Sequence, residues 1–351
     1  MADHRELRQL GTTDVELTAL GLGTAGLGGL FDPVDDIDAQ ATIDSAWASG
    51  CRYFDTSPFY GHGQSEIRTG RGLYRHDRAS FSVSTKVGRL FRRPADAANF
   101  TPDGWAGGLP FELHFDYTYD GIMRSVEDSY LRLGITQIDV LFIHDLDAQF
   151  HADPAELERH RTDLLTSGWM ALEQLKADGT VQAIGAGLND RPTMRWFLDH
   201  VPVDAFLLAL RYTLLENDVL DDELAQCLTD GVGVVIGGAF NSGILASGAV
   251  PGAKYNYGDA PVEVVDRVNR IAAVCDQHDT PMVAAALQFP AAHPATASVI
   301  PGALNAEHVE ANIAAFGFPI PPQLWSDLKN EGLLRDDAPT PTPQPTTNKD
   351  R

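Results

Sequence analysis

The sequence predicts an α/β fold in which eight strands and eight helices close into a (β/α)8 TIM barrel, preceded by a short N-terminal β-hairpin. Eight short apolar segments recur along the 351 residues, and most are continuously apolar, as in parallel strands covered on both faces. Helical patterns lie between them, and several end at a glycine. Because strand and helix alternate without a dividing linker, a closed barrel fits the pattern best.

The expected elements follow in order along the chain. The opening stretch LRQLGTTDVELTAL has two short β-type runs around GTTD, which predicts the hairpin, below the barrel. The expected strands are residues 15–23, 51–56, 80–87, 138–145, 181–188, 203–212, 231–238 and 296–302. The helical patterns between them include residues 36–50, 119–134, 168–179, 194–200, 221–231 and 261–279.

The barrel is expected to occupy residues 1–335 as a single domain. After about residue 336 the sequence becomes DDAPTPTPQPTTNKDR, which is too rich in proline, threonine and charge to bury a core. Residues 336–351 are therefore predicted to form a disordered C-terminal tail.

Composition narrows the possible partners. The chain has 26 Lys and Arg against 49 Asp and Glu, a formal charge of −23, which repels a polyanion such as nucleic acid. No apolar run approaches the roughly 20 residues that cross a bilayer, and charges stand where a secretion signal would be apolar. We therefore expect a cytoplasmic protein, monomeric or homodimeric, with no membrane partner. Three scattered cysteines predict neither a disulfide framework nor a metal site: Cys51, Cys227 and Cys275.

A glycine pattern offers a competing interpretation. Gly21, Gly23 and Gly26 match the G-x-G-x-x-G spacing of a Rossmann dinucleotide site, and Asp55 ends the next expected strand. In that motif a helix begins at the glycines, whereas here LGGLFDPVDD intervenes before any helical pattern. A flexible first loop of a barrel is the favoured interpretation.

Four polar residues lie at the carboxyl ends of successive expected strands. Asp55 ends the second strand and leads to Tyr60, Lys86 ends the third, and His144 ends the fourth. Each alone has a structural explanation, such as a helix cap or a satisfied core imidazole. Because the carboxyl ends of all barrel strands meet at one mouth, we expect the four to lie together.

The residue types indicate proton transfer. A tyrosine, with a reference pKa of about 10, needs a neighbouring cation to exchange protons near neutrality, and Lys86 is expected to lower the pKa of Tyr60. Asp55 would balance the buried ammonium, and a neutral His144 would orient the substrate oxygen. Tyr60 then becomes the general acid or base. No nucleophile arrangement or metal cluster accompanies it, so a cofactor is expected to do the remaining chemistry.

At these residues the sequence resembles the aldo-keto reductase superfamily. YFDTSPFYGHGQSE resembles its D-T-x-x-x-Y-G signature, VSTKVG its third-strand lysine, LFIHD its fourth-strand histidine, and IPGALNAEHVEAN its cofactor-binding eighth strand and helix. The resemblance covers about residues 7–330. It implies hydride transfer between a nicotinamide cofactor and a carbonyl or alcohol, with Asp55, Tyr60, Lys86 and His144 as a catalytic tetrad.

The resemblance also implies cofactor and substrate contacts. Where many members carry a lysine and an arginine that bind the 2′-phosphate of NADP, this chain has Gly302 and His308, which favours NAD. Asn189 is expected to hold the carboxamide, and Phe240 to replace a missing stacking tyrosine. Substrate contacts are expected from Tyr60, His144 and Arg89. The full expected cofactor set is Gly23, Thr24, Asp55, Asn189, Phe240, Asn241, Ser242, Gly243, Leu245, Pro301, Gly302, His308 and Asn312.

Phrases such as FDYTYDGIMRSVEDSYLRLG and LFIHDLD are similar to the branch with D-threo-aldose (L-fucose) 1-dehydrogenases and a pyridoxal 4-dehydrogenase. This implies oxidation of the C1 hydroxyl of an aldose to the lactone. Alternatives are pyridoxal oxidation, general aldehyde or ketone reduction, and a nicotinamide-sensing subunit without turnover. The long segment 88–120 after the third strand is expected to overhang the mouth and shape specificity.

Overall fold

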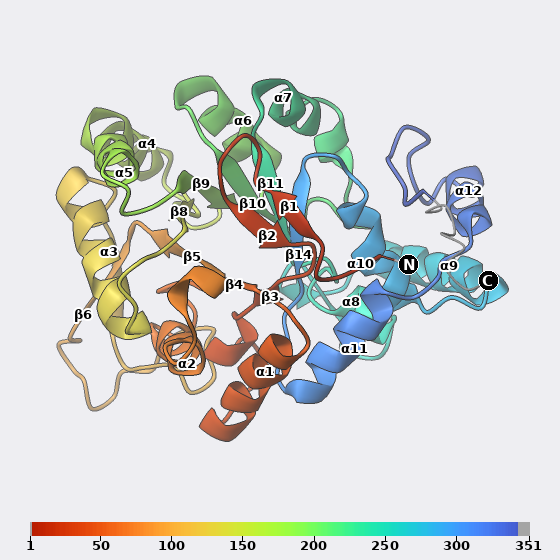
Figure 1. Ribbon diagram of the computed structural model, residues 1–351, viewed down its shortest axis with the longest axis horizontal. Helices are drawn as coiled ribbons and strands as arrows, with labels where there is room; N and C mark the ends of the chain where they lie inside the picture. The colour runs from red at the N-terminus through yellow and green to blue at the C-terminus, as the bar shows by residue number, and fades with distance from the viewer. Residues whose placement is uncertain (1, 343–351) are drawn as a thin grey trace.

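The computed structural model describes residues 2–342, and its centre is a parallel sheet of eight strands closed into a barrel (Figure 1). Leu20 pairs with Val299, and Gly23 pairs with Gly302, in the two bridges that join the first strand to the last. The prediction of a (β/α)8 barrel is confirmed. In sheet order the strands are β14 (Thr296–Ile300), β11 (Gly233–Gly237), β10 (Ala205–Ala209), β9 (Ala183–Leu188), β8 (Val140–His144), β5 (Ser82–Val87), β4 (Tyr53–Asp55) and β3 (Leu22–Gly23).

Helices surround the barrel on its outside (Figure 1). Several begin at side-chain caps, since a short polar side chain can accept a hydrogen bond from a free backbone N–H of the first turn. Asp35, Thr118, Asp190 and Asn305 act in this way. The helices are α1 (Asp36–Ala48), α2 (Gln64–Leu73), α3 (Tyr119–Leu133), α4 (Pro154–Asp163), α5 (Trp169–Ala177), α6 (Arg191–His200), α7 (Glu223–Asp230), α8 (Ile244–Ser247), α9 (Val262–Gln277), α10 (Met282–Ala291), α11 (Ala306–Phe316) and α12 (Pro322–Asn330).

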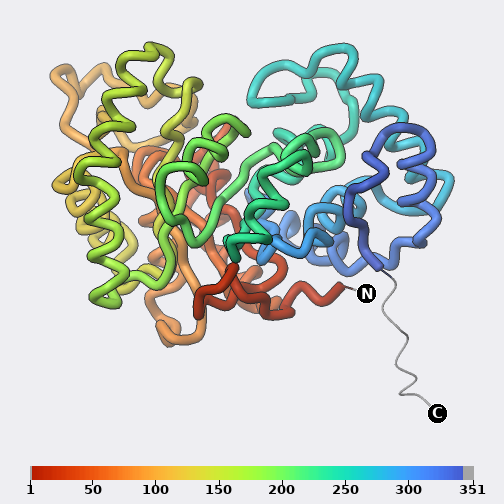
Figure 2. Tube along the Cα trace, turned by 90° about the horizontal axis from the view of Figure 1, so that it is seen from above, coloured from red at the N-terminus to blue at the C-terminus, as the bar shows by residue number. Residues whose placement is uncertain are grey.

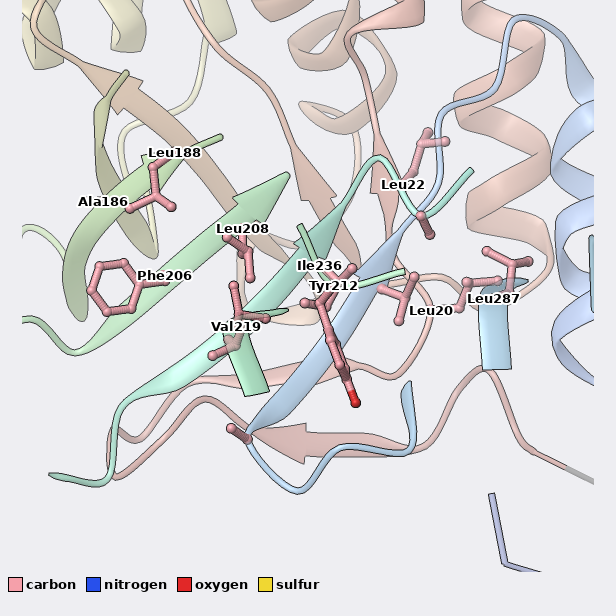
Figure 3. Packing of buried hydrophobic residues seen from close by; sticks show 14 of the residues in the cluster. Leu20, Leu22, Ala186, Leu188, Phe206, Leu208, Tyr212, Val219, Ile236 and Leu287 are labelled. Carbon is pink, nitrogen blue, oxygen red and sulfur yellow. The ribbon is translucent and has the colours of Figure 1, made fainter. Parts of the chain in front are cut away.

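Alternate residues of each strand enter two different cores. On β10, Phe206 and Leu208 belong to the cluster between sheet and helices (Figure 3), whereas Ala205 and Leu207 belong to the cluster inside the barrel. Since both faces of the sheet are covered, both sets of side chains are apolar. This explains why the strands are continuously apolar in the sequence.

The predicted N-terminal hairpin closes the bottom of the barrel. β1 (Leu7–Gln9) pairs antiparallel with β2 (Glu16–Thr18), and Leu10, Val15 and Leu17 join the interior cluster. The expected strand 15–23 is therefore two elements, β2 in the hairpin and β3 in the barrel. The chain passes closely between neighbours at Gly21, where an added Cβ would lie 2.8 Å from Tyr53.

Two hairpins rise from the opposite end of the barrel. Within segment 88–120, β6 (Arg89–Arg92) pairs with β7 (Glu112–Phe115), and after β11 a second hairpin joins β12 (Lys254–Tyr255) to β13 (Gly258–Asp259). In Figure 2 the orange and cyan segments that contain them both lie on the upper side, away from the red N-terminal hairpin. They border the mouth at the carboxyl ends of the strands.

The described part of the predicted tail packs against the domain. Ala338 is buried, and its carbonyl oxygen accepts a hydrogen bond of 2.8 Å from Lys329 Nζ. Residues 343–351 lie outside the described residues, so the division at residue 335 and the disordered tail stay predictions. Across residues 2–342, none of the helices combines the length and the apolar character needed to cross a bilayer.

Candidate active site

The structure brings together the four polar residues predicted from the strand ends. Asp55 ends β4, Lys86 lies near the end of β5, His144 ends β8, and Tyr60 follows in the loop after β4. The rings of Tyr60 and His144 have centroids 6.0 Å apart, and Lys86 Nζ lies 4.6 Å from the centre of the Tyr60 ring. Parallel strands therefore place these side chains at one mouth, as the barrel geometry requires.

Lys86 and Asp55 form a buried ion pair. Lys86 Nζ donates to both carboxylate oxygens, at 2.8 and 3.1 Å, and to the carbonyl oxygen of Thr56 at 2.8 Å. Ser84 Oγ donates to Asp55 Oδ1 at 2.7 Å. Burial raises the pKa of the Asp55 carboxyl, and the Lys86 charge opposes that rise. The pair is held by hydrogen bonds on both sides, which a buried ion pair requires.

The expectation that Lys86 lowers the pKa of Tyr60 is wrong for this structure. Burial raises the pKa of the Tyr60 phenol well above its usual value, and the negative charges of Asp55 and Asp145 add to the rise. The physical reason is that desolvation of the buried phenol, together with the two carboxylates, outweighs any stabilisation of the phenolate by Lys86, whose ammonium is paired with Asp55. Tyr60 is a neutral phenol in this cavity.

His144 is held in the neutral state, as expected. Burial lowers its pKa well below the usual value, and the nearby cations Arg89 and Lys86 lower it further. Its Nδ1 lies 3.1 Å from Ser57 Oγ, and its Nε2 lies 3.1 Å from Asp145 Oδ2. The hydrogen bond with Ser57 fixes the orientation of the ring, and Nε2 is left beside the Asp145 carboxylate.

Asp145 is a site residue that sequence reasoning missed. Arg89 Nη2 donates to its Oδ2 at 2.5 Å, and Asn189 Nδ2 donates to its Oδ1 at 2.9 Å. Burial raises the pKa of Asp145 to about 7, against the opposing charge of Arg89. Arg89, expected to touch the substrate, is instead buried beside Asp145, and its guanidinium stacks on Phe59 at 3.9 Å.

A cavity of about 430 Å³ opens over Tyr60, Lys86 and His144. Its polar wall contains Tyr60, His144, Asp145 and Asn189, together with Gln149. Segment 88–120 contributes Asp103, Gly104 and Trp105, in line with the expectation that it overhangs the mouth. The remaining wall is largely aromatic and comes from Phe31, Phe59, Phe150 and Tyr257. Such a cavity, with few polar groups in an apolar wall, is typical of a small-molecule site.

A second cavity, of about 310 Å³, adjoins the first along the ends of β3, β11 and β14. Tyr60 and Tyr257 line both cavities, so a molecule in one meets a molecule in the other there. We call the second cavity the groove. Of the expected cofactor contacts, those that line it are Gly23, Asp55, Phe240, Ser242, Gly243, Pro301, Gly302 and His308.

The other expected cofactor contacts lie elsewhere. Asn189 lines the substrate cavity, and Leu245 lies in the core. Thr24 donates to the carbonyl oxygen of Asp55 at 2.8 Å, and Asn312 donates to that of Gly302 at 3.2 Å. Asn241 Nδ2 donates to the carbonyl oxygen of Leu210 at 3.2 Å. Thr24, Asn241 and Asn312 therefore brace the loops that form the groove.

Close packing of β3 on β14 requires a glycine at one edge of the groove. An added Cβ on Gly23 would lie 2.8 Å from the carbonyl oxygen of Ile300, so only glycine fits there. No lysine or arginine is among its described lining residues, and His308 is its one imidazole. Two arginines on α9 do not line the groove and are hydrogen-bonded elsewhere. Arg267 donates to the carbonyl oxygens of Leu215 and Leu333, and Arg270 donates to that of Glu331.

Tyr257 is the second site residue missing from the sequence-based set. It lies at the turn of the β12–β13 hairpin, where its φ is 65°, and its hydroxyl donates to Asn189 Oδ1 at 3.4 Å. Its backbone N–H donates to Ser242 Oγ at 2.9 Å, which ties the hairpin to the groove. No sequence motif marks Tyr257, because it belongs to a loop whose position relative to the cavities is set by the tertiary fold.

A separate group of possible metal ligands was not foreseen. Atoms of His151, Glu156 and His160 lie within 4.8 Å of one another. The guanidinium of Arg159 lies 3.3 Å from His160 Nε2, however, and a cation so close opposes the binding of another. The prediction of no metal site stays a prediction. The three cysteines are free and buried, and burial raises the pKa of Cys51 to about 11.

Comparison with known proteins finds relatives over nearly the whole chain. Residues 19–330 match the aldo/keto reductase family. The chain is 41% identical to pyridoxal 4-dehydrogenase of Microbacterium luteolum, covering 94% of this chain and 98% of the relative. It is 37% identical to D-threo-aldose 1-dehydrogenase of a Pseudomonas species, covering 93% and 96%. A solved aldo-keto reductase of Bacillus halodurans, in its holo form, superposes with a TM-score of 0.72 at 23% identity, covering 93% and 95%.

Proposed function

Because the chain belongs to the aldo/keto reductase family, and is thus an NAD(P)-dependent oxidoreductase, we propose that it oxidises the C1 hydroxyl of a cyclic aldose with NAD. The product is the lactone. The single observation that carries the proposal is that Tyr60 lies where the groove meets the substrate cavity, beside Lys86 and His144. An acid or base at that point can act on a molecule in the cavity while a cofactor occupies the groove.

The groove fits an extended nicotinamide dinucleotide. Glycine backbone lines it closely at Gly23, and Gly302 has open space around its Cα, since an added Cβ there meets only an oxygen at 4.0 Å. Phe240 and Ser242 would hold the cofactor on one side, and Pro301 and Gly302 on the other. When bound, NAD supplies the acceptor for the hydride that leaves C1 of the sugar.

The protein residues manage the proton. As the C1–H bond breaks and the C=O bond forms, the hydroxyl proton would pass to the Tyr60 oxygen, which must be a phenolate at that moment because a neutral phenol cannot take a second proton. The substrate would lose a hydride and a proton, and Tyr60 would end the step as the neutral phenol. Lys86 keeps its charge through Asp55 and lies 4.6 Å from the centre of the Tyr60 ring, where its ammonium would stabilise the phenolate that accepts the proton. His144, neutral and hydrogen-bonded to Ser57 through Nδ1, lines the cavity, and its Nε2–H would donate to the reacting oxygen. Aromatic walls exclude water from the reacting groups.

The charge of the groove supports NAD over NADP. The 2′-phosphate of NADP is a dianion that proteins bind with arginine and lysine. The described lining of the groove has neither, and the formal charge of the whole chain is −23. We therefore propose NAD as the cofactor.

A second candidate substrate is pyridoxal. The relative named for pyridoxal is 41% identical to this chain, and an aromatic ring would pack on the aromatic wall of the cavity. A sugar ring presents C–H groups to the same surfaces and hydroxyls to the polar wall. General reduction of aldehydes or ketones is the reverse of the same chemistry.

The test is a substrate panel. The purified protein is mixed with NAD and with L-fucose, D-arabinose, other aldoses or pyridoxal, and absorbance is followed at the NADH band. We expect turnover with at least one aldose, faster with NAD than with NADP. If NADH binds but no member of the panel turns over in either direction, the chain is a nicotinamide-sensing protein rather than an enzyme.

We also propose that the protein works in the cytoplasm, as a monomer or a homodimer. The three cysteines are free thiols in the structure, which suits a reducing compartment. Light scattering on the purified protein would decide between the two assembly states.

A further inference from the structure

One charged group of the cavity wall has no part in the proton transfer by Tyr60: the carboxylate of Asp145. The residue is only 4% exposed and follows directly after β8. Its backbone N–H donates to the carbonyl oxygen of Gly187 at 3.0 Å, so the pairing of β8 with β9 extends through it. Its φ is 44°, in the left-handed region that a residue with a Cβ adopts only where its surroundings impose it. The fold thus turns this carboxylate into the wall of the cavity.

Two donors hold the carboxylate. Arg89 Nη2 donates to Oδ2 at 2.5 Å, and His144 Nε2 lies 3.1 Å from the same oxygen. Asn189 Nδ2 approaches Oδ1 at 2.9 Å. An ionised carboxylate has about four acceptor positions, two on each oxygen. Oδ2 is occupied by Arg89 and crowded by His144, and Oδ1, which accepts from Asn189, keeps one position for a donor from the cavity.

A buried cation opposes the loss of charge on Asp145. Arg89 is 1% exposed, and its guanidinium lies between the rings of Phe59, at 3.9 Å, and Phe150, at 4.2 Å. Pairing with Arg89 makes an ionised carboxylate tolerable in an apolar wall. A ligand that displaces water from the open acceptor position without supplying a donor would leave that position unsatisfied, which is unfavourable. The ligand must bring its own donor.

We propose that Asp145 determines specificity by accepting a hydrogen bond from a substrate hydroxyl next to the carbon that is oxidised. The inference rests on the proposed function and deepens it. In the proposed reaction the reacting oxygen would lie between Tyr60 and His144, whose ring centroids are 6.0 Å apart. Because Asp145 Oδ2 is 3.1 Å from His144 Nε2, the hydroxyl that Asp145 binds would be a near neighbour of the reacting carbon. In an aldose this is the C2 hydroxyl, and in an ortho-hydroxylated aromatic aldehyde it is the phenol.

The experiment compares substrates with and without this hydroxyl. D-Arabinose and 2-deoxy-D-ribose are the same sugar apart from the C2 hydroxyl, and 2-hydroxybenzaldehyde and benzaldehyde form a second pair. We expect kcat/KM of the wild type to favour the hydroxylated member by on the order of 10- to 100-fold, the usual scale for a hydrogen bond to a charged acceptor. In Asp145→Asn the preference should fall several-fold, because a neutral acceptor binds more weakly.

Asp147→Asn is the matched control. Asp147 is a buried carboxylate two residues away that accepts backbone N–H groups of Gln149 and Phe150 and does not line the described cavity. Its variant should keep the preference. If Asp145 only positioned His144, Asp145→Asn would lower both members of a pair equally, and this result would overturn the proposal.

A binding measurement separates this inference from the proposed reaction. If no compound is turned over, the proposed function fails, and calorimetric titration of each pair into the protein with NADH still tests Asp145. Tighter binding of the hydroxylated member to the wild type, lost in Asp145→Asn, supports the inference. Equal affinities within each pair, or no binding of any member, overturn it.

Discussion

Asp145 Oδ2 lies 3.1 Å from His144 Nε2, while Ser57 Oγ lies 3.1 Å from the other nitrogen of the same ring. A carboxylate beside a neutral ring favours the tautomer with its proton on Nε2, and Nδ1 then accepts from the Ser57 hydroxyl. The imidazole is thus oriented before a substrate arrives. Its function depends on the charge state of Asp145.

That charge state should produce a pH dependence near neutrality. Burial is the main cause that raises the pKa of Asp145 to about 7; Asp147 and Asp190 add to the rise, and Arg89 and Lys86 oppose it. Below this pH the carboxyl is protonated and accepts fewer hydrogen bonds, and above it the full acceptor set is present.

We therefore expect kcat/KM for D-arabinose to rise between about pH 6 and about pH 8, with a midpoint near 7. The pKa of His144 is lowered well below its usual value, so the imidazole does not titrate in this window. Initial rates at saturating NAD across the range are the measurement. The rise in kcat/KM between about pH 6 and about pH 8 should disappear in Asp145→Asn. If the rise persists in that variant, another group causes it.

Tyr60→Phe should lower turnover by at least about 10²-fold, because the phenol oxygen is the group that exchanges the proton. The affinity for NADH, measured by fluorescence titration, should stay within a few-fold of the wild type, since the ring remains. Tyr74→Phe, at an exposed position after α2, is the control and should be fully active. Full activity of Tyr60→Phe would remove Tyr60 from the mechanism.

Asp55→Asn should destabilise the fold by about 3 to 5 kcal/mol, because it leaves the buried Lys86 ammonium without a carboxylate. Adding Lys86→Met should recover much of that loss, since no charge is then buried. Urea unfolding monitored by circular dichroism gives the free energies. Asp128→Asn removes an exposed pair with Arg124 and should cost about 1 kcal/mol or less. Equal losses for the buried and exposed pairs would contradict the argument.

The cofactor preference should respond to charges placed at the groove. The wild type is expected to use NAD better than NADP, and Gly302→Lys with His308→Arg should narrow or reverse the ratio of kcat/KM. Each well-placed charge-assisted contact contributes about 1.5 to 3 kcal/mol. The ratio of kcat/KM for NAD to that for NADP could therefore change by about ten-fold to roughly a thousandfold or more. An unchanged ratio would mean that a 2′-phosphate does not reach these positions. A wild type that prefers NADP would contradict the proposal outright.

Tyr257→Ala should weaken both NADH binding and substrate binding, because this side chain lines the groove and the substrate cavity. Removing the ring exposes both sites to water, and a several-fold rise in each constant is expected. Fluorescence titration and steady-state kinetics measure the two effects. Tyr257→Phe keeps the ring and loses only the hydrogen bond of 3.4 Å to Asn189, so it should remain close to the wild type. If only one of the two constants changes in Tyr257→Ala, the side chain contributes to binding at that site alone.

The barrel and the four clustered residues were predictable because their signals are local. Each strand is a continuous apolar run, and Asp55, Lys86 and His144 stand at the carboxyl ends of such runs. Once the fold class is known, strand ends must meet at one mouth. By contrast, α2 has no clear apolar stripe, because its buried face carries Glu66 and Arg68, which pair with side chains from other elements.

By itself, then, the sequence determined the parallel barrel, the hairpin beneath it and the residues of the central ion pair, because apolar periodicity and strand-end position are properties of neighbouring residues. Only the tertiary structure decided the electrostatics of the site. Arg89, Asp145 and Asn189 come from different segments, and their contact makes a buried charged group with one open acceptor position. The same burial left Tyr60 protonated, against the expectation from residue types, because desolvation depends on everything packed around a group and not on its neighbours in the chain.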